Sequence, residues 1–315
     1  MRNFDTIRRM ELEDWNRNAA FYRDDADAPL MRHLAQRRDA TYALQPGERV
    51  LDLGCGTGAT VARLRSQGID AVGIDFAPEM IRAATQQHDL AAHVTCAEAT
   101  KIPFEDQRFD VVMADGVLHH LAVQGKLIVA LREVRRVLKP GGRLCVFDRN
   151  GSIMSALLLR VAITAKTMIG LVTGRRHYPS SATRNEIPFG GMSDQRLLKR
   201  CGFLPVRSRP VASAPFFMSV VLLNAMQYFL SRRLRQRLEI PVARMVSWID
   251  DRCAFAPLCV EQISVWQSVA PRLPQRTIEV TKLGANLRSM PVAQVSIPKL
   301  KVNVPLPVLH AEEVV

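Results

Sequence analysis

The stretch Val50-Leu51-Asp52-Leu53-Gly54-Cys55-Gly56-Thr57-Gly58 decides the fold of this 315-residue chain. A short apolar run leads directly into three glycines at alternate positions, and a helical pattern follows them at Ala59–Ser66. Glycine allows backbone conformations that other residues avoid, so the N–H groups of a strand-to-helix turn can approach a ligand closely. The stretch therefore predicts a buried strand that ends in a cofactor-binding turn.

On both sides of this turn, short apolar runs alternate with longer amphipathic runs, which is typical of β-α-β units and a parallel sheet. The expected strands are Arg49–Leu53, Ala71–Asp75, His93–Cys96, Phe109–Ala114, Arg143–Asp148, Phe203–Ser208 and Glu261–Val269. The expected helices, besides a helical region within residues 1–45, are Ala59–Ser66, Pro78–Gln87, Val123–Val137 and Ser193–Cys201. Lys139-Pro140-Gly141-Gly142 predicts a turn before the fifth strand.

An acidic residue, Asp75, ends the expected second strand, where a carboxylate can accept hydrogen bonds from both hydroxyls of a ribose. The glycines by themselves leave two cofactors open, because Gly54-x-Gly56-x-x-Ala59 also fits a relaxed dinucleotide fingerprint. None of the four tyrosines has a lysine four residues further on, which argues against a short-chain dehydrogenase site. No P-loop is present either, because no Lys-Ser/Thr pair follows the glycines.

Several ordered motifs resemble those of class I S-adenosylmethionine-dependent methyltransferases, and most of all the ubiquinone/menaquinone-biosynthesis-like group of small-molecule and lipid methyltransferases. They are Val50–Gly58, Gly73-Ile74-Asp75, Ile102-Pro103-Phe104 with Phe109-Asp110-Val111-Val112, Val117-Leu118-His119-His120-Leu121, and Arg136-Val137-Leu138-Lys139-Pro140-Gly141-Gly142. The resemblance implies a Rossmann-like α/β fold. Its seven-stranded sheet is mostly parallel with an antiparallel last strand, has helices on both faces, and carries helical insertions in the C-terminal half.

The same resemblance implies S-adenosyl-L-methionine as the cofactor and assigns residues to it. The glycines would face its methionine part, Asp75 its ribose, Phe76 the adenine ring, and Glu98 with Ala99 the adenine amino edge. Asp115 would lie near the methionine amino group, and Tyr22 would close over the cofactor from the N-terminal cap. Most relatives have Asp where Glu98 stands. The full expected set is Tyr22, Asp52, Gly54, Cys55, Gly56, Gly58, Asp75, Phe76, Met80, Glu98, Ala99, Asp115 and His120.

Methyl transfer by in-line SN2 displacement needs a protein base only when the attacking atom must lose a proton. His119 and His120 follow the fourth strand on the side where a substrate would enter, so either is a candidate base. They could instead cap the next helix or pack against the cofactor. No metal is expected, because the six cysteines are scattered, form no C-x-x-C pair and have no histidine at zinc-ligand spacing.

The net charge of +13 belongs entirely to the second half of the chain. Residues 1–150 hold 21 Lys and Arg against 21 Asp and Glu, whereas residues 151–315 hold 22 against 9. Such asymmetry suggests an anionic partner, either nucleic acid or membrane headgroups, although a solvated basic surface gives the same count.

The expected domain organisation is an N-terminal helical cap at 1–45, a methyltransferase domain at 46–270 and an irregular, basic, proline-containing tail at 271–315. Substrate or lid insertions are expected at 151–192 and 211–258. Ser213–Leu230 carries no charge and is followed by Arg232, Arg233, Arg235 and Arg237. It could be a lid over a lipophilic pocket, an interfacial helix or a membrane span.

We therefore expect an enzyme that methylates a small lipophilic acceptor, such as a quinone precursor, a polyketide or a lipid. An RNA methyltransferase that uses the basic half, or a non-catalytic binding protein, are the alternatives. Nucleic acid is disfavoured, because interleaved aromatic and basic residues are lacking. The start MRNFDTIRRMELEDW has no apolar stretch, so we expect a cytoplasmic protein, with membrane-surface contact at the inner face through 213–237.

Overall fold

A computed structural model describes residues 4–19, 29–149, 195–213, 232–252 and 259–269, together with the single positions 157, 161 and 164. Residues 1–270 form one compact unit. The tail expected at 271–315 and nearly all of the insertion expected at 151–192 lie outside the described residues.

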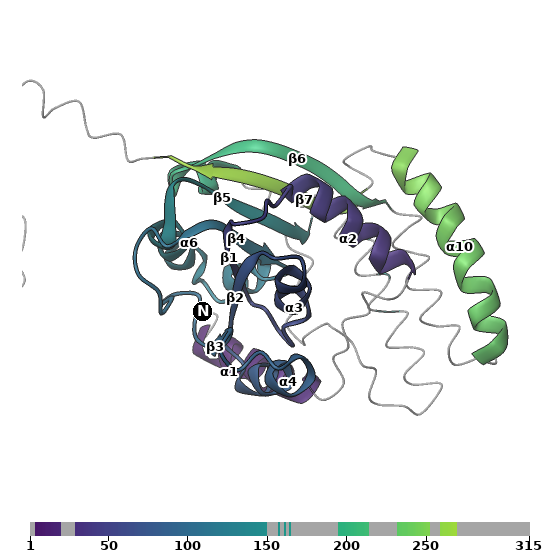
Figure 1. Cartoon of the computed structure of the whole chain (residues 1–315), viewed down its shortest axis with the longest axis horizontal. Coiled ribbons are helices and arrows are strands. Elements are labelled where there is room, and N and C mark those ends of the chain that lie inside the picture. Colours follow the sequence, from purple (N-terminus) through teal and green to yellow (C-terminus); the bar gives the residue numbers. More distant parts are fainter. Residues whose placement is uncertain are drawn as a thin grey trace, which may run out of the picture. The chain divides into compact units, whose positions relative to one another are not determined.

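Seven strands form one sheet in the order β3-β2-β1-β4-β5-β7-β6 (Figure 1). The first five strands of this order run parallel, whereas β7 is antiparallel to both β5 and β6. Their bounds are β1 Arg49–Leu53, β2 Asp70–Asp75, β3 Val94–Cys96, β4 Phe109–Asp115, β5 Leu138–Arg149, β6 Phe203–Ser213 and β7 Cys259–Ser268. The predicted Rossmann-like sheet with an antiparallel last strand is confirmed.

The strands form because both faces of the sheet are buried. Successive residues of a strand point to opposite faces, and Val50 and Val111 belong to one apolar cluster while Leu51 and Val112 belong to the other. Helices cover each face. The first cluster is completed by α2 Pro29–Tyr42, α3 Ala59–Ser66, α4 Pro78–His88 and α10 Arg232–Arg252, and the second by α5 Leu118–Val123, α6 Leu127–Val137 and α8 Gln195–Arg200.

Three of the predicted elements differ from the structure by more than two residues at one end. The helix expected at Val123–Val137 begins only at Leu127, as α6, because Gly125 with a φ of 70° follows the end of a separate, unexpected helix, α5, whose last residue is Val123. The sixth strand ends at Ser213 rather than Ser208. The fifth strand begins at Leu138 rather than Arg143. The expected turn residues are instead part of an irregular strand, whose register with β4 shifts between Phe109 and Val111.

The order of the strands places the topological switch point of the sheet between β1 and β4. Chain connections run from β1 to β2 on one side and from β4 to β5 on the other, so the direction of winding reverses between β1 and β4. In open α/β sheets ligands bind outside the carboxyl ends of the strands at such a switch point. The glycine turn follows β1 directly, so the fold puts it where a cofactor is expected.

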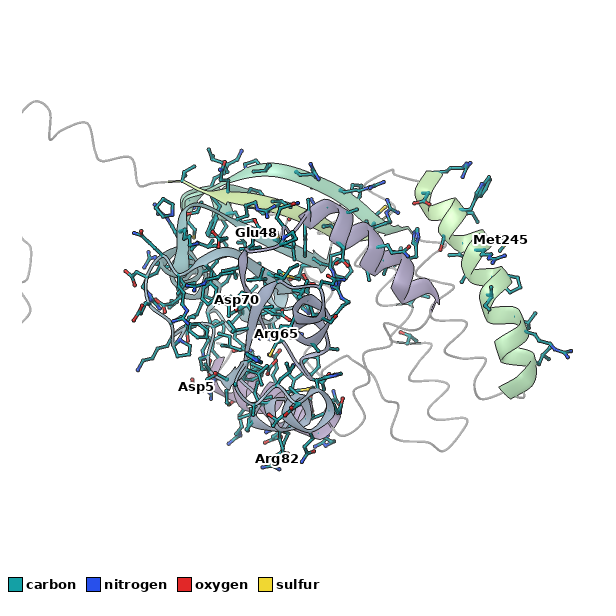
Figure 2. The ribbon with its side chains drawn as sticks, viewed as in Figure 1. Asp5, Glu48, Arg65, Asp70, Arg82 and Met245 are labelled. Atoms are coloured by element: carbon teal, nitrogen blue, oxygen red, sulfur yellow. The ribbon has the colours of Figure 1, made fainter. Side chains whose placement is uncertain are left out.

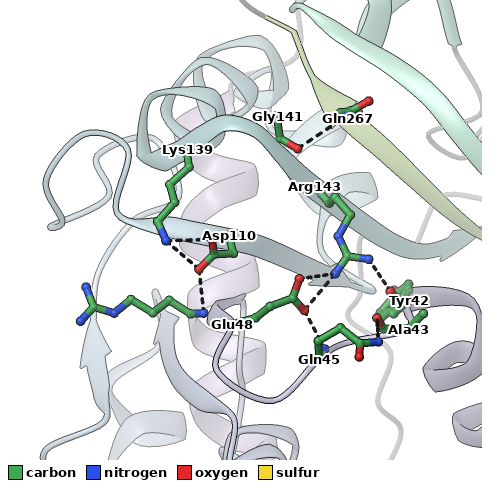
Figure 3. A network of polar contacts seen from close by, with 10 residues as sticks. Tyr42, Ala43, Gln45, Glu48, Asp110, Lys139, Gly141, Arg143 and Gln267 are labelled. Carbon is green, nitrogen blue, oxygen red and sulfur yellow. Dashed lines mark hydrogen bonds and ion pairs between the residues drawn. The ribbon is translucent and has the colours of Figure 1, made fainter.

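The opposite, amino edge of the parallel strands carries a network of paired charges (Figure 3). The Arg143 guanidinium donates to both carboxylate oxygens of Glu48, at 2.7 and 2.9 Å, and to the carbonyl of Tyr42 at 2.7 Å. Lys139 donates to both oxygens of Asp110 at 2.8 and 2.9 Å. These residues line a cavity of about 280 Å³. Because each of the four charges has a partner of opposite sign, the network joins α2, β4 and β5 structurally.

Among the described helices, none is long and apolar enough to cross a membrane. Most of the uncharged segment expected at Ser213–Leu230 lies outside the described residues.

Candidate active site

The glycine turn has a backbone that only glycine adopts easily. Gly54, Gly56 and Gly58 have φ values of 76°, 53° and 78°, in the left-handed region that costs other residues energy. Gly54 donates its N–H to the carbonyl of Ile74 at 2.7 Å, which ties the turn to β2. A Cβ on Gly54 would lie 2.2 Å from Cγ2 of Val117. The turn is therefore fixed by its neighbours as well as by its own conformation.

Asp75 meets this turn directly. One carboxylate oxygen accepts the N–H of Gly56 at 3.0 Å, and the other accepts the N–H of Ala77 at 2.9 Å. Burial raises the pKa of Asp75, and the backbone hydrogen bonds oppose that rise only in part. Each carboxylate oxygen keeps a second lone pair, so the group can still accept hydrogen bonds from a ribose. The structure thus brings together the two features that the sequence singled out.

Two residues beside the turn are held inside the protein. Asp52 is buried in β1. The Cys55 thiol lies against β2, because a Cβ on Gly73 would be 2.7 Å from its Sγ, and burial raises the pKa of this thiol well above its ordinary value. Contacts of either residue with a cofactor stay predictions.

Helix α1, Phe4–Asn18, covers the end where adenine is expected. Its Leu12 and Trp15 pack, as Phe76 does, against a small buried cluster that includes Met80. Tyr22, the residue expected to close over the cofactor, lies outside the described residues.

The carboxylate expected to meet the adenine amino edge is already paired. Glu98 accepts hydrogen bonds from Arg8 on α1 and from Lys126, the latter at 3.3 Å. Burial alone would raise the pKa of Glu98, but the hydrogen bond from Arg8 and the charge of Lys126 outweigh it, so the pKa is lowered. Ala99 packs partly buried beside the second apolar cluster. An adenine amino group would have to share Glu98 with two cations.

Asp115, at the end of β4, is held by two side chains of α2 that sequence reasoning missed. Arg38 donates to one carboxylate oxygen at 2.9 Å and the Tyr42 hydroxyl donates to the other at 2.5 Å. Burial raises the pKa of Asp115, while the Arg38 charge and the Tyr42 hydrogen bond act against that rise. The spacing of four residues puts Arg38 and Tyr42 on one helix face, but nothing local indicates which strand they meet.

His119 forms a dyad with Asp148, which lies on β5 beside the end of β4. The two are joined twice: Nδ1 lies 2.7 Å from Oδ1, and the backbone N–H of His119 donates to Oδ2 at 3.1 Å. Because a carboxylate only accepts, Nδ1 must carry the proton, which leaves Nε2 with a lone pair. Within the described part of the chain this Nε2 is buried and has no hydrogen-bond partner. It is a group equipped to take up a proton.

His120 is placed differently, although it is the next residue. Its Nδ1 lies 3.2 Å from the fully buried carboxylate of Glu11 on α1, and Trp15 meets its ring edge-on at 5.6 Å between centroids. Burial, followed by the proximity of His119, lowers the pKa of His120, while Glu11 opposes this. Glu11 also accepts from Gln124 at 2.5 Å. Each histidine therefore has its own carboxylate partner, Asp148 on β5 for His119 and Glu11 on α1 for His120, and the role of either as a base stays a prediction.

In the part of the chain with described side chains, no group of His, Cys, Asp and Glu could hold a metal ion.

Comparison with known proteins supplies the family. Residues 51–146 match the family described as a methyltransferase domain. The chain is 28% identical over 144 residues to the probable tRNA methyltransferase 9B of Bos taurus, covering 45% of this chain and 29% of that protein. It is 39% identical over 104 residues to the demethylmenaquinone methyltransferase of Beutenbergia cavernae, covering 33% and 42%. The solved phosphoethanolamine N-methyltransferase 2 of Haemonchus contortus, in complex with S-adenosyl-L-methionine, gives a TM-score of 0.47 at 17% identity, covering 76% and 52%.

A parallel sheet with an antiparallel last strand, a glycine turn at its switch point and an acid at the tip of the neighbouring strand define a Rossmann-like, nucleotide-cofactor-binding protein. The match shows that residues 51–146 are a methyltransferase domain of the class I S-adenosylmethionine-dependent kind, with S-adenosyl-L-methionine as the cofactor. The chain covers less than half the length of either curated relative.

Proposed function

We propose that this protein methylates a small, apolar acceptor whose attacking atom must lose a proton, and that His119 removes this proton. A phenol-like hydroxyl of a quinone precursor or polyketide has the required chemistry. The observation that carries the proposal is the His119–Asp148 dyad, whose Nε2 is buried and has no partner among the described residues.

The cofactor fits the residues around the switch point. Asp75 lies directly beside the glycine turn and accepts the N–H of Gly56, and Asp115 with Arg38 offers one charge of each sign to an amino acid group. When bound, S-adenosylmethionine supplies a methyl group that its sulfonium already activates. The protein therefore has to hold the acceptor in line, exclude water and take up one proton.

Each member of the dyad has a separate task. Asp148 fixes the tautomer and the ring orientation of His119 through two hydrogen bonds, and it stabilises the imidazolium once the proton has moved to Nε2. The deprotonated acceptor atom is the stronger nucleophile.

The similarity to a probable tRNA methyltransferase, together with the basic residues 151–315, supports a second candidate function, methylation of RNA. It requires binding through phosphate contacts, which weakens steeply as salt rises. A small apolar acceptor needs no such dependence.

Methyl transfer from isotopically labelled S-adenosylmethionine to hydroquinones, phenolic polyketides and tRNA tests the proposal. We expect His119→Gln to lower kcat by roughly 10²- to 10⁴-fold while calorimetry shows unchanged cofactor affinity. Asp148→Asn should lower kcat as well and should change its pH profile. His88→Gln is the matched control, because His88 is an exposed histidine at the end of α4.

Folded protein that binds no S-adenosylmethionine would overturn the function as a whole. Full activity of His119→Gln would overturn the role of the base alone. Methylation of tRNA in preference to every small acceptor would establish the second candidate.

A further inference from the structure

Helix α10 presents an apolar stripe to solvent. The stripe consists of residues spaced by four and three positions, which line one side of a helix: Leu234, Leu238, Pro241, Met245 and Trp248. Leu238 is 37% exposed, Met245 58% and Trp248 57%; Met245 is labelled in Figure 2. Large apolar side chains that gather on one exposed face mark an interaction surface more often than scattered ones do.

The opposite side of α10 holds the helix to the domain. Ala243 and Val246 are buried in the first apolar cluster, which α2 and the sheet share. Asp251, on the flank between this side and the stripe, lies 3.7 Å from Arg37 and 3.9 Å from His33, both on α2. The stripe is therefore not the core-facing side of the helix, and its exposure follows from how α10 packs.

The charges beside the stripe are mostly positive: its flank carries Arg237, Arg244 and, seven residues further on, Asp251. Arg237 and Arg244 are exposed and lie one position before Leu238 and Met245, on the same flank of the stripe. Arg252 stacks over the ring of Trp248, 4.1 Å from its centroid. In the sequence, the uncharged residues 213–230 and then Arg232, Arg233 and Arg235 come directly before these positions.

We propose that the α10 stripe docks onto an anionic lipid bilayer. An amphipathic helix with Leu, Met and Trp on one face and arginines beside it lies in the membrane interface, where the apolar side chains enter the acyl boundary and the arginines meet headgroups. Tryptophan favours that depth because its ring is apolar and its N–H is polar. This surface stands on observations separate from the active site.

A second copy of the chain fits the stripe less well. Two stripes paired as a coiled coil would place positions 237 and 244 next to the partner helix, where ion pairs normally determine which helices associate and in which orientation. A parallel pair would set these arginines against Val242 and Ile249 and give them no acidic partner. An antiparallel pair would set Arg244 against its own copy, and Arg237 would find an acid only at Asp251, which already lies beside Arg37 and His33 of α2.

Co-sedimentation of the full chain with vesicles tests the proposal. We expect binding to vesicles of phosphatidylcholine mixed with phosphatidylglycerol, weaker binding to phosphatidylcholine alone, and loss of the difference as salt rises. The double variant M245S/W248S should bind roughly a hundredfold more weakly, because it no longer transfers two apolar side chains from water into the bilayer. R237Q/R244Q should bind anionic vesicles roughly tenfold more weakly.

Matched controls come from other helices. I128S/V129S removes two exposed apolar side chains from α6, and K199Q/R200Q removes two exposed cations from α8; both should bind as the wild type does. Equal vesicle binding by M245S/W248S, or no binding by the wild type, would overturn the proposal. So would a dimer that M245S/W248S dissociates, since a second copy then covers the stripe. Calorimetric titration with S-adenosylmethionine in every variant reports separately on the methyltransferase site.

Discussion

At the amino edge of the parallel strands Asp110 is paired with Lys139, whereas at the carboxyl edge Asp75 accepts the backbone N–H groups of Gly56 and Ala77. The direction of the pKa shift differs accordingly. Burial raises the pKa of both carboxyls, but at Asp110 the hydrogen bonds from Lys139 and the N–H of Arg49 outweigh it and lower the pKa. At Asp75 burial dominates and the pKa is raised.

This difference shows which edge favours the folded chain and which is arranged for a ligand. A paired carboxylate with a lowered pKa stabilises the native state. A buried carboxylate with a raised pKa costs free energy in its ionised form until a ligand donates a further hydrogen bond to it. The same residue types thus serve stability at one edge and binding at the other.

The largest expected effect contrasts a glycine from each edge. Gly54→Ala should lose about 3 kcal/mol of stability, from left-handed strain together with the clash against Val117, and should abolish measurable S-adenosylmethionine binding. Gly141→Ala shares the positive φ, at 77°, but its Cβ would meet nothing closer than 3.8 Å. It should cost about 1 kcal/mol and leave binding intact. Urea unfolding and calorimetry measure both, and equal effects on binding would erase the distinction between the edges.

Removing the central cation of the amino-edge network should affect stability alone. Arg143→Met breaks the hydrogen bonds to Glu48 and to the Tyr42 carbonyl, which should cost about 2 kcal/mol in urea unfolding. Arg82→Met, which removes an exposed guanidinium paired only with Glu79 three residues away, should cost less than about 0.5 kcal/mol. Cofactor affinity should be unchanged in both. A large loss of affinity in Arg143→Met would show that the network also shapes the cofactor site through Tyr42.

Acid titration should give slopes of opposite sign at the two edges. Because the folded pKa of Asp110 is lowered, its contribution is present above the ordinary aspartate pKa and is lost as pH falls through the folded value. Because the folded pKa of Asp115 is raised, its contribution is present below the ordinary value and is lost as pH rises through the folded one. Asp110→Asn should flatten the acid loss of stability, and Asp115→Asn should steepen it. Unfolding free energies measured across the acid range would reject this account if both variants changed the slope in the same direction.

Local patterns predicted the centre of the fold well. The glycine turn, its strand and Asp75 lie within a single β-α-β unit, where the spacing along the sequence determines which residues come together. The second half of β6, Arg209–Ser213, escaped prediction because Arg209 and Pro210 interrupt the apolar pattern, and a proline is tolerated here since β6 lies at the edge of the sheet beside β7. The break between α5 and α6 was missed because the apolar period continues across Gly125.

The parts of the site that sequence missed depend on distant pairings. Arg38 and Tyr42 meet Asp115 from more than 70 residues away, and Glu11 meets His120 from more than 100. Asp148 also escaped, because only the order of the strands shows that β5 lies beside β4 and so brings its carboxylate to His119.

The smallest expected effect concerns helix α1, whose Arg8 pairs with Glu98 where adenine is expected. Both side chains are about one third exposed, so the pair itself contributes less than about 1 kcal/mol. If the adenine amino group takes Glu98 as its acceptor, it must displace Arg8. Arg8→Gln should then tighten S-adenosylmethionine binding by about threefold, whereas Arg9→Gln, an exposed neighbour on the same helix, should leave it unchanged. Weaker binding in Arg8→Gln would mean that the position of α1 supports cofactor binding, because α1 also carries Trp15, which packs against the same small cluster as Phe76 and meets the ring of His120.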